Sequence, residues 1–248
     1  MENSKKLSLA IPTYEFNGRG AEVLEYIFNQ LNQQVFQNFD IVISDDSKDN
    51  NILNLCNKWE SSLNIKYYKN TIRGASSNFN NAISKCTGEI IKFLCGDDYL
   101  FNEYSLKKIV SAFDKNTNWL ASAYWHTKNK EDYFNFHLPS INPNIFVINT
   151  IGSPSCIAFR NMRNIPLFDP NLTYYYDCEW YYRIMKLHGC PKFLNEPTIV
   201  NYLWENSITS IVTDELQKKE VEYILNKYKF ELEDRNENRN RNKNKNKE

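Results

Sequence analysis

Short apolar segments alternate with amphipathic segments along residues 7–94, and few folds accommodate this order. The apolar segments have the length and composition of β-strands and lie at 7–11, 39–43, 65–68 and 89–94. The amphipathic segments repeat apolar residues at helical spacing and lie at 20–34, 52–59 and 78–86. Strand–helix–strand units of this kind form right-handed crossovers between parallel strands. We therefore predict an α/β fold with a mainly parallel central sheet flanked by helices.

Polar residues follow three of these predicted strands closely. They are Thr13-Tyr14-Glu15, Asp45-Asp46 and Asp97-Asp98. In an open α/β sheet, ligands bind beyond the carboxyl ends of the strands. We expect the three clusters to form one site, although they are far apart in the sequence.

Two of these clusters contain adjacent carboxylates. Repulsion between Asp97 and Asp98 would be relieved by a hard cation such as Mg²⁺ or Mn²⁺ together with phosphate oxygens. An exposed turn or a helix N-cap would explain this pair without a ligand. Asp45 and Asp46 can accept hydrogen bonds from a ribose hydroxyl or a base N–H, or form an Asx-type turn.

A helix predicted over 174–187 carries two acidic residues in its first half. Helical spacing places Glu179 one turn before Arg183, which favours an ion pair. Asp177 has no basic residue at the following turn and is a candidate general base. The alternative is a carboxylate that only interacts with the helix dipole. The aromatic residues of this helix are expected to belong to the core.

Composition excludes several classes of partner and cofactor. Lys and Arg together number 30, as do Asp and Glu, so no net charge attracts nucleic acid or anionic lipid. The three histidines and six cysteines show no zinc-ligand spacing, and any bound metal should be held by oxygen. Gly18-Arg19-Gly20 lacks the further glycine of a Rossmann fingerprint and the lysine of a P-loop.

The sequence also bears on location and domain organisation. Its first residues lack the apolar stretch of a secretory signal, and no segment approaches the roughly 20 apolar residues of a membrane span. We expect a cytoplasmic protein with reduced thiols, and peripheral contact with the inner face of a membrane stays open. We predict one domain over 1–232 and a disordered, solubilising Asn/Lys/Arg-rich tail over 233–248, with contact to phosphate or anionic lipid as the alternative role of the tail.

Five segments stand out in the following order: LSLAIPTYE, FDIVISDDSKD, RGASSNFNNAISKCTGEIIKFLCGDDYL, IGSPSCIAFR and FDPNLTYYYDCEWYYRI. In order and spacing they resemble the family 2 glycosyltransferases with a GT-A fold, over residues 7–210. The resemblance is greatest to bacterial enzymes of capsule, lipopolysaccharide or cell-wall synthesis. It implies transfer of a sugar from a nucleotide diphosphate sugar, with a UDP-sugar favoured, to a hydroxyl of a glycan or lipid-linked acceptor.

The resemblance also implies roles for the matching residues. Those expected to contact the nucleotide sugar are Pro12, Thr13, Tyr14, Glu15, Asp46, Arg73, Asn78 and Asp97. Asp46 matches the residue that contacts the base, Asp98 the ligand of a Mn²⁺ or Mg²⁺ ion, and Asp177 the catalytic base. The implied reaction is inverting: Asp177 removes the proton of the acceptor hydroxyl, which attacks the anomeric carbon as the nucleoside diphosphate leaves.

Three residues depart from the family pattern. Tyr176 replaces a glutamate before the catalytic aspartate, Ser77 replaces an arginine before Asn78, and Trp204 replaces a histidine near the diphosphate. Arg73 is a substitute for the missing arginine. The departures keep open a non-catalytic nucleotide- or glycan-binding protein of the same fold. Nucleotidyl transfer also uses paired aspartates, but the missing glycine- and lysine-rich loop counts against it.

Overall fold

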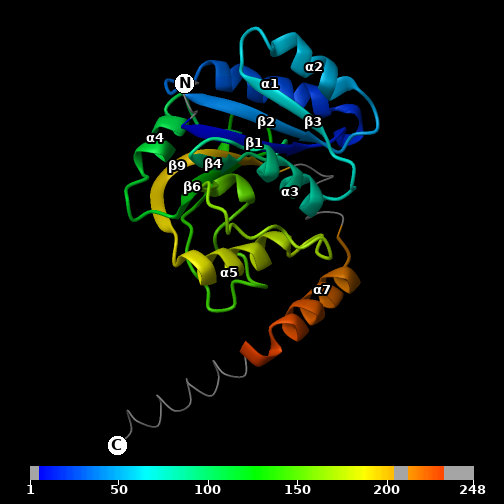
Figure 1. Cartoon of the computed structure of the whole chain (residues 1–248), viewed down its shortest axis with the longest axis vertical. Coiled ribbons are helices and arrows are strands. Elements are labelled where there is room, and N and C mark those ends of the chain that lie inside the picture. Colours follow the sequence, from blue (N-terminus) through cyan, green and yellow to red (C-terminus); the bar gives the residue numbers. More distant parts are fainter. Residues whose placement is uncertain (1–5, 204–211, 232–248) are drawn as a thin grey trace, which may run out of the picture.

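The computed structural model of the protein describes residues 6–203 and 212–231 (Figure 1). Within these residues, nine strands form one sheet: β1 (Leu7–Thr13), β2 (Phe39–Asp45), β3 (Ile65–Lys69), β4 (Ile90–Phe93), β5 (Tyr99–Leu100), β6 (Trp119–Thr127), β7 (Tyr133–His137), β8 (Ile157–Arg160) and β9 (Lys192–Tyr202). The strand order is β3-β2-β1-β4-β8-β6-β9-β5, with β7 paired to β6. Trp204 and the tail at 233–248 lie outside the described residues.

The described helices flank this sheet. They are α1 (Gly20–Asn32), α2 (Asn51–Trp59), α3 (Ala75–Lys85), α4 (Ser105–Ser111), α5 (Tyr176–His188) and α7 (Asp214–Lys227), with short 3-10 turns at Phe16–Gly18 and Pro154–Cys156. The helices predicted from periodicity are all present. No helix in the described part of the chain has both the length and the apolar composition that crossing a membrane requires.

The sheet is parallel in its first half and mixed in its second. β1 pairs in parallel with β2 and β4, and β2 with β3, as the alternation of strands and helices predicts. After β4 the neighbours β8 and β6 run antiparallel, whereas β6 and β9 are parallel. The sheet is therefore parallel over β1 to β4, as expected, and mixed beyond them, where β6 and β9 are a parallel pair. One reason is local: β6 and β7 are joined directly, without the crossover helix that a parallel pair needs.

Two hydrophobic cores lie on opposite faces of the sheet. One contains the apolar faces of α1, α2 and α4, and the other those of α3, α5 and the end of α7. Figure 1 shows α1 and α2 on one side of β1 and β2, and α3 and α5 on the other. In α1, for example, Leu24, Ile27, Phe28 and Leu31 recur at helical spacing and are all buried. Both faces being covered explains why β1 and β2 are buried along nearly their whole length.

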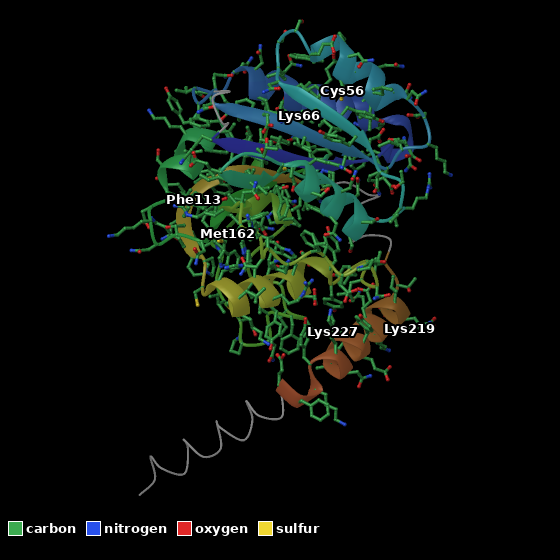
Figure 2. All side chains as sticks on the ribbon, viewed as in Figure 1. Cys56, Lys66, Phe113, Met162, Lys219 and Lys227 are labelled. Carbon is green, nitrogen blue, oxygen red and sulfur yellow. The ribbon has the colours of Figure 1, made fainter. Side chains whose placement is uncertain are left out.

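Helix α7 is attached to α5 by buried polar contacts. Glu220 of α7 accepts hydrogen bonds from the backbone N–H groups of Thr173, Tyr174 and Tyr175 at 2.6, 3.0 and 2.9 Å. Lys227, labelled on α7 in Figure 2, donates to Glu179 of α5 at 2.8 Å. The Glu220 carboxylate thus provides an acceptor for three backbone N–H groups just before α5, where a helix start leaves N–H groups without partners inside the helix. Helix α7 thereby fixes the start of α5.

Candidate active site

The carboxyl ends of β1 and β2 and the start of α3 are joined by hydrogen bonds to one carbonyl. Thr13 O accepts from Asp46 N and from Asn78 Nδ2, both at 2.9 Å. Pro12, one residue earlier, is opposite Ser44 in the parallel register. The structure therefore brings together four residues that the resemblance assigns to the nucleotide sugar.

Asp45 and Asp46 have different surroundings. Asp45 is buried, and its carboxylate accepts from Ser47 N at 2.8 Å and from Tyr67 Oη at 2.6 Å. The Asx-type turn considered from the sequence is therefore found at Asp45. Asp46 is partly exposed and accepts from Gly74 N at 3.2 Å, so it faces the loop before α3.

Ser77 supports that loop. Its hydroxyl donates to Gly74 O at 2.9 Å and also to Ile72 O. Arg73 lies between these two residues and is exposed. Arg73 is therefore part of the loop that Asp46 contacts.

The loop that carries Asp97 and Asp98 packs closely against the end of β1. A Cβ at Gly96 would lie 2.9 Å from Thr13 Oγ1, a distance too short for any side chain. Burial, together with the nearby carboxylates of Asp97 and Glu15, raises the pKa of Tyr14 to about 12. Tyr14, Glu15 and Asp97 thus lie close together, and the Tyr14 phenol stays neutral at physiological pH.

Asp98 is held by residues from two distant segments. Its carboxylate accepts from Ser153 Oγ at 2.9 Å and from Asn201 Nδ2 at 2.6 Å. The side chain is buried, and this burial raises the pKa of Asp98. Asp97 is more exposed. Both donors to Asp98 are neutral, so they orient the carboxylate without cancelling its charge.

A buried lysine lies beneath this loop. Lys92 of β4 is completely buried, and its ammonium donates to Phe93 O at 2.5 Å and to Ser155 O. Burial lowers the pKa of Lys92 to about 8. Ser155 Oγ accepts from Cys95 N at 2.8 Å. Lys92 and Ser155 together tie the segment around 155 to the strand and loop that lead to Asp97.

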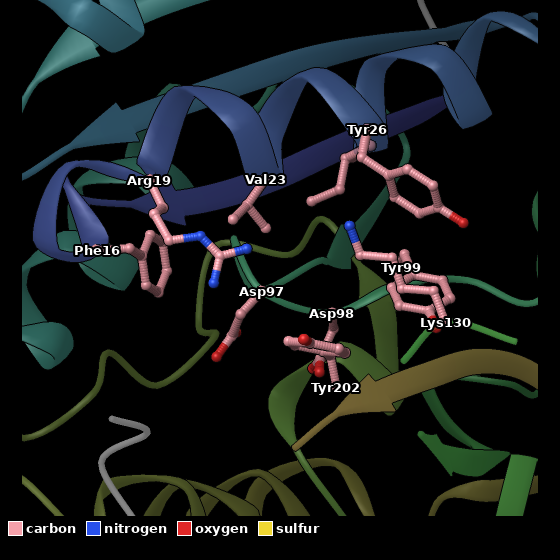
Figure 3. A pocket seen from close by; sticks show the side chains of 10 residues that line it. Phe16, Arg19, Val23, Tyr26, Asp97, Asp98, Tyr99, Lys130 and Tyr202 are labelled. Atoms are coloured by element: carbon pink, nitrogen blue, oxygen red, sulfur yellow. The ribbon is translucent and has the colours of Figure 1, made fainter. Parts of the chain in front are cut away.

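An open cavity adjoins Asp97 and Asp98 on the side of α1 (Figure 3). It has a volume of about 430 Å³, including space open to solvent. Besides the two aspartates, the residues that line it are mainly aromatic, aliphatic or basic: Phe16, Arg19, Val23, Tyr26, Ile27, Tyr99, Lys130 and Tyr202. Lys130 Nζ lies 4.3 Å from the centre of the Tyr26 ring. Of the two aspartates beside the cavity, Asp97 is partly exposed and Asp98 is buried.

Asp177 lies in the first turn of α5. Its carboxylate accepts from Cys178 N at 2.7 Å and from Asn149 Nδ2 at 2.8 Å. Burial raises the pKa of Asp177 to about 6, and these hydrogen bonds limit the increase. A carboxyl group with a pKa near the operating pH is well suited to general base catalysis.

Tyr176 connects the two acidic regions. Burial raises its pKa well above the usual value, and Asp177, Asp97 and Asp98 all add to this increase through their charges. The ring also packs on Phe79, with centroids 5.7 Å apart. A phenol at this position avoids adding a fourth carboxylate to the cluster. The departure from the family pattern is therefore compatible with three ionised aspartates nearby.

Glu179 and its aromatic neighbours have structural roles. Arg183 Nη2 lies 2.7 Å from a Glu179 oxygen, which confirms the predicted ion pair, and Tyr228 also donates to Glu179. Trp180 and Tyr181 are fully buried, so they belong to the core as predicted. Of the two acidic residues in this helix, only Asp177 is available for chemistry.

Four polar residues at this site were not predicted from the sequence as site residues: Lys92, Asn149, Ser153 and Asn201. A lysine inside the apolar strand 89–94 was a visible signal. The others are single polar residues in loops or at a strand end, where asparagine and serine are ordinary. Their relevance appears only when the tertiary structure brings them to a carboxylate.

The donor set suits a divalent ion bound together with phosphate. Within residues 6–203 and 212–231, no group of three or more His, Cys, Asp and Glu side chains forms a complete metal site. Mg²⁺ in nucleotide enzymes is typically held by one or two carboxylates, several waters and the substrate phosphates. Asp97 and Asp98 provide two such carboxylates beside an open cavity. The residues present therefore fit an ion that the substrate helps to hold.

Comparison with known proteins identifies the class. The model of glycosyl transferase family 2 matches residues 8–185, and the chain belongs to this family. The chain is 25% identical over 182 residues to an uncharacterized glycosyltransferase of Rickettsia conorii, covering 71% of this chain and 29% of the relative. It is 31% identical over 100 residues to a GalNAc(5)-diNAcBac-PP-undecaprenol β-1,3-glucosyltransferase of Campylobacter jejuni, covering 39% of this chain and 31% of that enzyme. The chain thus spans about three tenths of the length of these relatives.

Solved structures confirm the fold as GT-A. TarS 1–349 of S. aureus, in complex with UDP-GlcNAc, superposes with a TM-score of 0.61 at 19% identity, over 84% of this chain and 61% of TarS 1–349. The mannosyltransferase PcManGT of Pyrobaculum calidifontis, in complex with GDP-Man and Mn²⁺, gives a TM-score of 0.60 at 15% identity, over 84% of this chain and 59% of PcManGT. At these identities the likeness concerns the fold alone.

Proposed function

We propose that this chain transfers a sugar from a nucleoside diphosphate sugar to a hydroxyl of a glycan or lipid-linked acceptor, with inversion and with a divalent metal. The observation that carries the proposal is that one short segment contacts both acidic centres: Asn149 Nδ2 donates to Asp177 at 2.8 Å, and Ser153 Oγ donates to Asp98 at 2.9 Å. Asp98 and Asp177 are therefore held by neighbouring residues, as a diphosphate site and a general base that act on one substrate require. Family membership supports the same reaction class.

The nucleotide would lie over the ends of β1 and β2. Asp46 would accept a hydrogen bond from the base, and Tyr14 and Glu15 would lie between it and Asp97. Arg73 would supply a cation beside Gly74, whose N–H donates to Asp46. A UDP-sugar is favoured because TarS binds UDP-GlcNAc and shares the fold, whereas PcManGT, with GDP-Man, shows that the fold also accepts guanine.

The metal would be held by Asp98, with Asp97 beside it. The Asp98 carboxylate accepts hydrogen bonds from Ser153 and Asn201, and the Ser155 side chain and the Tyr202 backbone also hydrogen-bond to it, so a metal would replace or share some of these contacts. When bound, the ion supplies positive charge where the leaving diphosphate gains negative charge. PcManGT, which shares the fold, forms a complex with GDP-Man and Mn²⁺, and this supports a divalent ion in the proposed reaction.

Asp177 would act as the general base. An ionised Asp177 accepts the proton of the acceptor hydroxyl as the oxygen forms a bond to the anomeric carbon. The bond from that carbon to the diphosphate breaks in the same step, so one displacement inverts the centre. The acceptor of the Campylobacter relative is a glycan linked to undecaprenol through a diphosphate, which supports a lipid-linked acceptor class for this chain.

Nucleoside diphosphate release from UDP-, GDP- and dTDP-sugars, with and without Mn²⁺, tests the proposal. We expect metal-dependent release from a UDP-sugar that Asp98→Ala abolishes. Asp114→Ala is the matched control, because this exposed aspartate pairs with Lys192 outside the site. Binding of donors without any release would instead support a non-catalytic binding protein. Release of pyrophosphate from a nucleoside triphosphate would support nucleotidyl transfer.

A further inference from the structure

The side chain of Asn149 connects Asp177, the candidate base, to the backbone of Ile151 and Gly152, which follow Asn149 in the chain. Asn149 Oδ1 accepts from Ile151 N at 3.1 Å and from Gly152 N at 2.8 Å. Asn149 Nδ2 donates to Gly152 O at 3.1 Å and to Asp177 Oδ2 at 2.8 Å. In the reverse amide orientation, the Asn149 NH₂ group would face the N–H groups of Ile151 and Gly152, and donors would meet donors. The network therefore determines which end of the amide meets Asp177.

The segment from 149 to 153 is held in place by close packing and by hydrogen bonds to its neighbours. Gly152 has a φ of +120°, and a Cβ there would lie 2.4 Å from the Tyr124 ring, so only glycine fits. Gly152 O also accepts from Tyr181 Oη at 2.9 Å, one helical turn beyond Asp177. At the other end of the segment, Ser153 Oγ donates to Asp98 at 2.9 Å. One short segment thus touches both acidic centres of the site.

The contacts of this segment extend to β4. The next residues, Pro154–Cys156, form a 3-10 turn, and the Lys92 ammonium donates to Ser155 O within it. Asp177 and Asp98 come from elements about 80 residues apart, yet the same segment supports both. A shift of this segment would move the base and the diphosphate site relative to each other.

We propose that Asn149 is a positioning residue of the transfer reaction, and that it aims the Asp177 carboxylate at the acceptor hydroxyl. The inference rests on the proposed function and goes beyond it in naming what orients the base. Cys178 N on Oδ1 and Asn149 Nδ2 on Oδ2 place a hydrogen bond at each carboxylate oxygen and so fix the carboxylate plane. The Cys178 side chain and the Asp177 backbone N–H also hydrogen-bond to this carboxylate, and Asn149 is the partner from outside α5.

The titration of Asp177 gives this role a specific signature. The ionisable groups that interact with it are the phenols of Tyr124, Tyr176 and Tyr181 and the thiol of Cys178, and Tyr176 also interacts with Asp97 and Asp98. Burial raises the pKa of all three phenols and of the thiol, so these groups are neutral near pH 6. A hydrogen bond to a carboxylate favours its charged form, so removing Asn149 Nδ2 raises the pKa of Asp177.

Two variants separate positioning from loop structure. Asn149→Asp keeps an oxygen for Ile151 N and Gly152 N but replaces the donor to Asp177 with a second carboxylate. Asn149→Ala removes both functions. Thr150→Val is the control. Thr150 lies in the same segment as Asn149, but its Oγ1 donates to Ser140 O and not to Asp177. We expect a loss in kcat of about 10²-fold for both Asn149 variants, with donor KM changed less than about twofold.

The titration is measured directly by ¹³C NMR of aspartate carboxyl groups, with the Asp177 signal assigned by its loss in Asp177→Asn. We expect the Asp177 pKa to rise in Asn149→Ala and to rise by about one unit or more in Asn149→Asp, where two carboxylates share a site. The acid limb of the pH–rate profile should move upward with it. Thr150→Val should leave both unchanged.

Two results would overturn the inference. One is an Asp177 pKa in Asn149→Asp that equals the wild-type value. The other is a loss of turnover in Asn149→Ala with an unmoved acid limb, which would assign Asn149 to loop structure alone. The NMR titration needs no turnover, so it still tests the contact if no donor is consumed. Failure of the proposed function and failure of this inference are therefore separate outcomes.

Discussion

Asn201 Nδ2 lies 2.6 Å from Asp98 Oδ1, although the two residues are 103 positions apart in the chain. The contact joins the last residues of β9 to the loop after β4. Ser153 donates to the other oxygen of the same carboxylate. Asp98 is therefore oriented by neutral groups before any cation or substrate binds, and its charge is left for a ligand to balance.

Asp98→Asn should separate activity from stability. The amide has the shape of the carboxylate but not its charge, so we expect metal-dependent turnover to fall about 10²-fold or more. Because burial raises the pKa of Asp98, removing the charge should not lower the Tm of the metal-free protein. Mn²⁺ titration calorimetry and thermal unfolding measure the two effects. A variant that loses stability but keeps metal-dependent turnover would contradict the assignment, and Asp97→Asn tests the neighbouring carboxylate in the same assays.

Asp177→Asn should reduce kcat by about 10²- to 10⁴-fold, the usual contribution of a general base, while donor binding stays intact. The same residue sets the pH dependence of the wild type. Asp177 accepts a proton only when ionised, and its pKa is raised to about 6. Turnover should therefore increase as the pH rises through about 6 and level off above pH 7. A pH–rate profile at saturating donor measures this, and a flat profile between pH 5 and 7 would argue against Asp177.

Glu220→Gln should loosen the start of α5. Three backbone N–H groups lose a charged acceptor. A hydrogen bond to a charged group contributes about 1.5–3 kcal/mol to stability, and the amide oxygen of Gln replaces part of this contribution. We expect a destabilisation of about 1–3 kcal/mol in urea unfolding. Since Asp177 lies two residues beyond Tyr175, in the first turn of α5, kcat should also fall. Glu222→Gln, an exposed change on the same helix, should leave both quantities near the wild-type values.

Asp169→Asn should have an effect on stability that depends on pH. Burial alone would raise the pKa of Asp169, but Lys227 Nζ at 2.5 Å and Asn171 N at 3.0 Å lower it to about 2. A pKa lower in the folded state contributes stability above the unfolded value of about 4, and this contribution is lost as the pH falls toward 2. The full contribution at pH 7 is at most about 2 kcal/mol.

Urea unfolding at pH 7 and at pH 3 measures the prediction for Asp169. The cost of Asp169→Asn should be smaller at pH 3 than at pH 7, because the unfolded chain is then largely protonated at this position. Lys227→Met should remove most of this difference. An equal cost at both pH values would show that Asp169 contributes through shape and not through charge.

Strands β1 to β4, the helices between them and α5 were predictable from the sequence, whereas the strand pairing of the second half was not. Strands β1 to β4 are rich in apolar residues, and the helices between them repeat at a regular spacing, so local patterns identify them. From β5 onward, β5 has only two residues, and β6 pairs with β8 and β9, which come much later in the chain. Their pairing depends on partners far away in the chain, such as β9 for β5. Local periodicity contains no information about such partners.

The sequence by itself determined which carboxylates are candidates for the site. Asp46 and Asp98 follow predicted strands, and ligands bind beyond strand ends in an α/β sheet. Asp177 was predicted from its place in a helix and from the resemblance. Only the tertiary structure decided which groups orient them. Asn149 and Asn201 are ordinary polar residues in the sequence, and they become part of the site because chain segments separated by 28 and 103 positions meet there. A hydrogen bond requires a few tenths of an ångström of precision, and that precision comes from packing.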